Sequence, residues 1–206
     1  MSDELRVRFE EKVRAPGHRW LEAHRSDAGK RRPPDLWREI LVDLADTFHR
    51  RCAYTAMWIN CDGTVDHFVS IDEDLERAYD WDNLRYCAGW FNSKKQHIRS
   101  SDILDPLVVE DGWFELSWPD LQLRITDRCP EALRPGAERM LEDLGLRNGR
   151  RVIENRRAYR ALFDRHGAPA LQQIEEEAPL VARAIRDNVL SAQGPGAPED
   201  GSGEEP

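Results

Sequence analysis

Two adjacent residues, Asp66 and His67, place a carboxylate beside an imidazole in a segment rich in strand-forming residues. Side chains of neighbouring strand residues point to opposite sides, so one can ligate a metal ion while the other meets water. Asn83 and Asn92 follow and can return to this strand. Hydrolysis of a phosphodiester at neutral pH requires a general base, a divalent cation and a group that aligns the base. The residues therefore predict a site for that chemistry.

The elements expected to position these residues form a β-β-α unit. Residues 53 to 70 favour extended structure, and Asn60 to Gly63 predict the turn of a β-hairpin. A polar, acidic loop is expected over residues 70 to 80. Short helical segments are then expected from Asp82 to Asn92 and from Ser93 to Arg99.

Helices are expected before this core. Leu5, Phe9 and Val13 recur at intervals of four, which is typical of a short amphipathic helix that the Ala15-Pro16-Gly17 break would end. Asp35 is expected to cap a longer helix that leads into the core.

A second hairpin and further helices are expected after the core. The hairpin spans Trp113 to Thr126, and helices are predicted at Ala137 to Leu144, Arg150 to His166 and Ala170 to Leu190. The chain is therefore expected to be an α+β protein. Its parts are a helical flank (1–50), the core (51–100), a hairpin-and-helix region (101–190) and a disordered acidic tail (191–206).

Four short strings carry a resemblance to a known family. They are Cys52-Ala53-Tyr54-Thr55, Val65-Asp66-His67-Phe68, Tyr79-Asp80-Trp81-Asp82-Asn83-Leu84 and Asn92-Ser93-Lys94-Lys95. In this order they resemble the HNH endonuclease family, and in particular a branch of bacterial HNH proteins tied to phage defence. A weaker similarity extends the match to about residues 37–163.

The resemblance implies a ββα-metal fold and roles for the matching positions. Asp66 and Asn92 would hold one divalent cation, Mg²⁺ or Mn²⁺, while His67 would be the general base. Asn83 would fix the loop and orient His67. Lys95 would contact phosphate, with Lys94 beside it. The implied activity is DNA cleavage in anti-phage defence, together with an ATPase partner.

The chain departs from the family at the zinc positions. Many relatives hold a zinc ion with two C-x-x-C pairs, but here Thr55 stands three places after Cys52. Ala88 and Phe91 occupy the positions four and one before Asn92. A structural zinc is therefore not expected. Aromatic packing is expected in its place, by Tyr54, Trp58, Trp90 and Phe91.

Charge and composition bound the class of protein. A formal net charge of −9 argues against a strong nonspecific nucleic-acid binder. The arginines between Arg147 and Arg160 could face phosphate, or could form a solvated helix face. Without an apolar signal segment or a run of membrane-spanning length, a cytoplasmic protein with no membrane contact and reduced cysteines is expected.

Three functions stay open on the sequence. A metal-dependent DNA endonuclease is the favoured one. The others are an HNH-fold adaptor that has lost catalysis, and a toxin that uses the same chemistry on DNA or RNA. Asn83 and Asn92 could also be ordinary helix caps, and the acidic loop from Asp72 to Glu76 a solvated surface.

Overall fold

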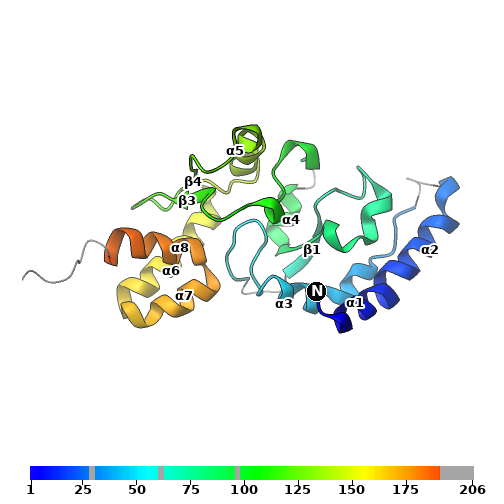
Figure 1. Cartoon of the computed structure of the whole chain (residues 1–206), viewed down its shortest axis with the longest axis horizontal. Helices are drawn as coiled ribbons and strands as arrows, with labels where there is room; N and C mark the ends of the chain where they lie inside the picture. Colours follow the sequence, from blue (N-terminus) through cyan, green and yellow to red (C-terminus); the bar gives the residue numbers. More distant parts are fainter. Residues whose placement is uncertain (28–30, 60–62, 96–97, 191–206) are drawn as a thin grey trace, which may run out of the picture.

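The computed structural model describes residues 1–27, 31–59, 63–95 and 98–190. Helices surround two small antiparallel sheets of two strands each, which confirms the α+β class. The molecule is elongated, with the N-terminal helices at one end, the β1 sheet in the middle and the C-terminal helices at the other end (Figure 1).

The central unit has a β-β-α order, but its second strand was not predicted. β1 (Gly63–His67) pairs with β2 (Leu84–Ala88), and α4 (Gly89–Lys95) follows without a break. The prediction of a helix from Asp82 to Asn92 is therefore wrong over its first half. All five residues of β2 are buried, so the strand lacks the alternation of polar and apolar residues that identifies a half-buried strand.

The segment predicted as the first strand of the hairpin forms a tight turn instead. The Cys52 amide donates to the Met57 carbonyl at 2.9 Å, and the segment's strand-like pairing within the described residues is one isolated bridge, between Arg51 and Trp58. The Ala53 amide also donates to the carbonyl of Tyr86 on β2. The expected turn at residues 60 to 62 lies outside the described residues.

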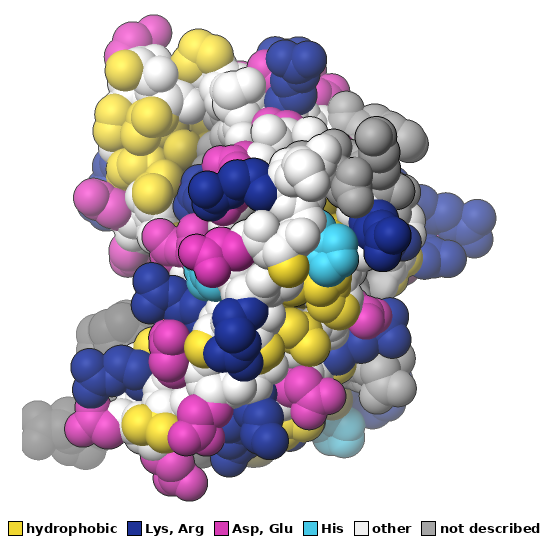
Figure 2. All heavy atoms as spheres, turned by 90° about the vertical axis from the view of Figure 1, so that its right-hand side faces the viewer, with side chains coloured by type: hydrophobic (Ala, Val, Ile, Leu, Met, Phe, Trp, Pro, Cys, Tyr) yellow, Lys and Arg dark blue, Asp and Glu magenta, His cyan; other side chains and the backbone are white. Residues whose placement is uncertain are grey.

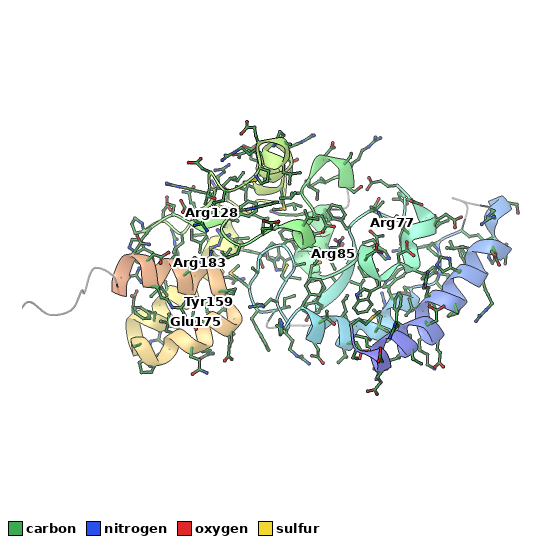
Figure 3. The ribbon with its side chains drawn as sticks, viewed as in Figure 1. Arg77, Arg85, Arg128, Tyr159, Glu175 and Arg183 are labelled. Atoms are coloured by element: carbon green, nitrogen blue, oxygen red, sulfur yellow. The ribbon has the colours of Figure 1, made fainter. Side chains whose placement is uncertain are left out.

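A buried arginine connects β2 to the chain that follows α4. Arg85 is 1% exposed and lies opposite Asp66 in the sheet register (Figure 3). Its guanidinium donates to the carboxylate of Asp105 at 3.0 Å and to the carbonyl of Asp82 at 2.6 Å. These bonds compensate the burial of its charge and fix the sheet against residue 105.

The N-terminal helix continues past the predicted break. α1 (Asp3–Phe9) passes through a wide π-turn (Glu10–Arg14) into α2 (Ala15–Ala23). Pro16 follows the widened π-turn, and the helix continues through it although proline donates no backbone hydrogen bond. Gly17 packs directly on the ring of Tyr79, since a β-carbon there would lie 2.3 Å from the ring.

The helix predicted after Asp35 begins as a 3₁₀ helix (Leu36–Ile40) and continues as α3 (Leu41–Thr47). Asp35 was expected to cap this helix, but its carboxylate pairs with Arg38 at 2.7 Å. The helix faces the core through Ile40 and Leu44, which are fully buried.

The second hairpin is confirmed by β3 (Phe114–Leu116) and β4 (Leu123–Ile125), which pair in antiparallel register. A 3₁₀ turn (Glu131–Leu133) then leads into α5 (Arg134–Asp143), which begins three residues before the predicted start.

The C-terminal helices follow the prediction with one interruption. α6 (Arg150–His166) has the predicted bounds. The single helix expected after it is divided into α7 (Leu171–Glu177) and α8 (Pro179–Ile185), because Pro179 starts a new helix; a π-turn (Arg186–Leu190) extends α8. No helix in the described ranges has the length and apolar character needed to cross a membrane. The tail predicted to be disordered lies outside them.

One hydrophobic cluster extends from the N-terminal helices through the β1 sheet to the C-terminal helices. On the face shown in Figure 2, basic and acidic side chains intermingle instead of gathering by sign. Among the described residues of this face, the basic side chains form no broad patch.

Candidate active site

A cavity of about 1110 Å³ lies beside β1 and α4. Four of the six residues predicted to form the site line it: Asp66, His67, Asn92 and Lys95. The segment before α3 and the loop after β1 contribute further residues to its lining. Its volume exceeds the ~300–1,000 Å³ typical of small-molecule pockets.

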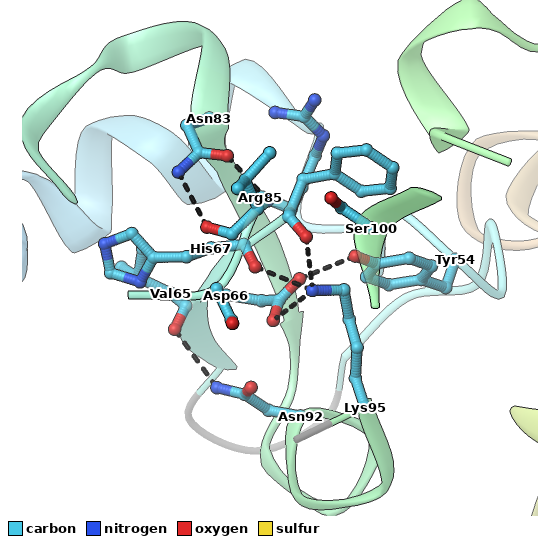
Figure 4. A network of polar contacts seen from close by, with 12 residues as sticks. Tyr54, Val65, Asp66, His67, Asn83, Arg85, Asn92, Lys95 and Ser100 are labelled. Carbon is cyan, nitrogen blue, oxygen red and sulfur yellow. Dashed lines mark hydrogen bonds and ion pairs between the residues drawn. The ribbon is translucent and has the colours of Figure 1, made fainter. Parts of the chain in front are cut away.

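Asp66 is buried but fully engaged. The Tyr54 hydroxyl donates to its Oδ2 at 2.6 Å, and the Lys95 ammonium lies 3.4 Å from its Oδ1 (Figure 4). Burial raises the pKa of Asp66, while Lys95 and Tyr54 act to lower that pKa. The two partners therefore favour the ionised form, which is the form that binds a cation.

His67 is held as a neutral imidazole. Its Nε2 lies 2.9 Å from the carbonyl oxygen of Ala78. A carbonyl can only accept, so Nε2 carries the proton and Nδ1 keeps its lone pair. Burial lowers the pKa of His67 to about 4. The edge of the Trp37 ring packs against the imidazole, with centroids 4.5 Å apart.

Asn83 closes the loop between β1 and β2. Its Oδ1 accepts from the Val69 amide at 2.8 Å, and its Nδ2 donates to the carbonyls of Val69 and Arg77 at 3.0 Å each. Arg77 precedes Ala78, the residue that accepts from His67. Asn83 thus ties together the loop whose Ala78 carbonyl contacts His67, and it lies outside the described lining of the cavity.

Asn92 turns its amide group toward β1. Its Nδ2 donates to the Val65 carbonyl at 3.1 Å, which directs the side-chain oxygen Oδ1 away from Val65. Figure 4 shows Asn92 and Lys95 of α4 approaching Asp66 of β1 from the same side. The Asn92 amide and the Asp66 carboxylate thereby both line the cavity, with the carboxylate already paired to Tyr54 and Lys95.

Lys95 has protein partners in place of the expected phosphate, and Lys94 does not line the described part of the cavity. Lys95 is 3% exposed, and its ammonium donates to the carbonyls of His67 and Phe68 at 2.6 and 2.8 Å besides pairing with Asp66. These three partners match its three donors. Lys94 lies outside the described lining of the cavity. Its ammonium lies close to Gly145, since a β-carbon at that glycine would be 3.1 Å from the Lys94 Nζ.

Aromatic packing is present at one of the altered zinc positions. Tyr54 stacks on Phe91 with centroids 4.9 Å apart, and Trp90 meets Phe91 edge-on at 5.4 Å. Cys52 and Cys87 are buried nearby as free thiols. Trp58 was expected to join this packing, but it is 37% exposed and lines a second, smaller cavity with Glu175.

The oxygen donors fit a hard divalent cation. Mg²⁺ is commonly bound through one or two carboxylates, with water and substrate phosphate as its other ligands. Asp66 and Asn92 would supply two ligands of that kind. Within the described ranges no three residues among His, Cys, Asp and Glu form a group that could hold a metal ion.

The arginine-rich stretch from Arg147 to Arg160 is partly structural. Arg156 is 2% exposed and donates to the carbonyls of Leu121, Leu146 and Arg147 at 2.9 to 3.2 Å. Its burial excludes it from the phosphate-facing surface that the stretch could have formed.

Several residues of the site were not recognised in the sequence. Tyr54 was expected to pack, and its hydroxyl bond to Asp66 was not foreseen, although a buried hydroxyl usually finds an acceptor. Trp37 and the basic segment at Arg31 and Arg32 showed no pattern that connected them to His67. Their position against the cavity depends on tertiary packing.

Comparisons with known proteins leave the family open. No protein-family model matches the chain, and neither curated proteins nor solved structures give a significant match.

Proposed function

We propose that this protein is a metal-dependent HNH endonuclease that hydrolyses DNA phosphodiester bonds in the cavity beside β1 and α4. The main support is the state and setting of His67. Its imidazole is neutral with an unprotonated Nδ1, and it lines the same cavity as the carboxylate of Asp66 and the amide of Asn92.

The proposed step begins with proton transfer from water to Nδ1 of His67. The resulting hydroxide attacks phosphorus, and the bond to the leaving oxygen breaks. The Ala78 carbonyl, which accepts from Nε2, stabilises the positive charge that the ring gains. Asp66 and Asn92 would hold Mg²⁺ or Mn²⁺, which supplies charge stabilisation at the scissile phosphate and leaving oxygen.

The proposed biological role is that of an effector in bacterial anti-phage defence, beside an ATPase partner. It rests on the resemblance to the defence branch of HNH proteins. The net charge of −9 is compatible with it, since an acidic nuclease that binds DNA weakly would depend on a partner to deliver substrate.

A cleavage assay tests the proposal. The purified protein is incubated with supercoiled plasmid, phage DNA and RNA in Mg²⁺ or Mn²⁺, with EDTA as a blank. DNA cleavage is expected to need the metal. His67→Ala should slow it by roughly 10²–10⁴-fold.

His166→Ala is the matched control, because His166 is exposed at the end of α6 and should leave cleavage unchanged. Equal activity of His67→Ala and wild type would overturn the proposal. Inert protein under every condition would favour the adaptor, and cleavage of RNA alone would redirect the chemistry to a toxin.

A further inference from the structure

A basic segment ahead of α3 forms part of the cavity wall. Arg31, Arg32 and Arg38 all line the cavity that contains His67. They belong to the N-terminal flank, outside the four strings that carry the family resemblance. Each of the three is exposed at the surface.

This segment is fixed next to the proposed general base. Pro33 is buried, and the carbonyl of Pro34 accepts a 2.8 Å hydrogen bond from the Tyr79 hydroxyl. Trp37 is 7% exposed and packs edge-on against His67 at 4.5 Å. Arg32 directly precedes Pro33, and Arg38 directly follows Trp37. Contacts around the proposed active site therefore fix the backbone at both arginines.

The cations of the cavity divide into two kinds. Lys95 lies deep and is bound to three protein oxygens, and Arg38 pairs with Asp35 at 2.7 Å. Within the described lining of the cavity, Arg31 and Arg32 are the exposed cations that remain for an incoming anion. A guanidinium can donate two parallel hydrogen bonds to phosphate, which makes arginine well suited to this role.

We infer that Arg31 and Arg32 bind the phosphate backbone of the DNA strand that enters the cavity containing His67. The inference rests on the proposed function and adds a substrate-binding element from outside the ββα core. Contacts to phosphate position a strand without reading its bases, so binding by these arginines should not depend on the DNA sequence.

Binding can be measured separately from cleavage. A short fluorescein-labelled DNA duplex is titrated with His67→Ala protein in Mg²⁺ by fluorescence anisotropy, at salt concentrations from about 50 to 200 mM. Adding Arg31→Ala and Arg32→Ala should weaken binding by roughly tenfold or more. The slope of log K against log salt should become shallower by about 2, because each neutralised phosphate contributes about 0.9.

The matched control removes two cations from the same flank away from the cavity. Lys12→Ala with Arg19→Ala changes net charge equally, and both side chains are exposed outside the described cavity lining. The Lys12→Ala/Arg19→Ala pair should leave the slope of log K against log salt unchanged. Circular dichroism should show unchanged thermal unfolding for both pairs, since exposed side chains are altered.

The inference would be overturned by an unchanged salt slope in the Arg31/Arg32 variant. It would also be overturned if the two pairs of substitutions lowered DNA-binding affinity equally. A failure of the His67→Ala protein to bind DNA at the lowest salt would overturn it as well. Metal-dependent cleavage by wild type that is lost in His67→Ala would leave the proposed function standing in each of these cases.

Discussion

The hydroxyl of Tyr54 donates a 2.6 Å hydrogen bond to Oδ2 of Asp66, and the ring of Tyr54 stacks on Phe91 of α4. The tight turn that begins at Cys52 thereby reaches the carboxylate proposed to bind metal. One side chain packs the turn against the helix and orients Asp66 at the same time.

Replacing Tyr54 with Phe should test this bond while keeping the stacked ring. Loss of a hydrogen bond to a buried charged group should lower the free energy of unfolding by about 1.5–3 kcal/mol, measured by urea denaturation in EDTA. Tyr159→Phe is the comparison, since the Tyr159 hydroxyl also bonds a carboxylate, Glu177, but is only half-buried. If Tyr159→Phe lowered the free energy of unfolding as much as Tyr54→Phe, burial would not be what makes the Tyr54–Asp66 bond strong.

Two neighbouring lysines of α4 should differ sharply. Lys95→Met removes the cation that pairs with the buried Asp66 and leaves two carbonyls without a donor. Breaking a buried pair costs about 3–5 kcal/mol. Lys94→Met, at an exposed position, should change stability by less than about 1 kcal/mol. Similar midpoints in urea for the two variants would refute this assignment.

His67 should make stability depend on pH below neutrality. Its pKa is about 4 in the folded protein and 6.5 in the unfolded chain, so the unfolded state binds more protons between those values. Stability should therefore fall as pH drops from 6.5 to 4, by about 3 kcal/mol in total.

The measurement compares wild type with His67→Gln in EDTA across that range. The neighbouring Asp66 and Lys95 are shared by both proteins, so the difference between the two curves isolates the imidazole. Parallel curves would show that His67 is not buried in its neutral form.

Arg156 should act on stability alone. Arg156→Met removes the donors of three backbone carbonyls and should destabilise the protein by at least about 2 kcal/mol. Arg157→Met, one position along α6 and exposed, should stay within about 0.5 kcal/mol of wild type in thermal or urea unfolding. The opposite ranking would place Arg156 at the surface.

Local patterns predicted the helices better than the sheet. α6 follows its 3.6-residue apolar period and ends before Gly167, whose positive φ of 65° suits glycine, so its bounds were recoverable from sequence. β2 was missed because its register sets Asp66 opposite Arg85, a pairing across the β1–β2 loop that no local period encodes.

The candidate site was predictable where a single side chain decides the geometry. Asn83 closes its loop as expected, since one amide can satisfy three backbone groups. The direction of Lys95 was not predictable. On a helix its side chain could face solvent or the core, and the choice depends on the carbonyls that β1 and the following loop place beside it.

The anchored segment from Pro33 to Trp37 bears on how this core can be inherited. Trp37 covers one side of His67, and Pro34 is tied to Tyr79 of the loop that holds the imidazole. Recombination that exchanged residues 51–100 alone would carry the ββα core into a new protein with that side of His67 uncovered. The stretch that must be inherited together therefore begins by residue 33, ahead of the predicted start of the core at residue 51.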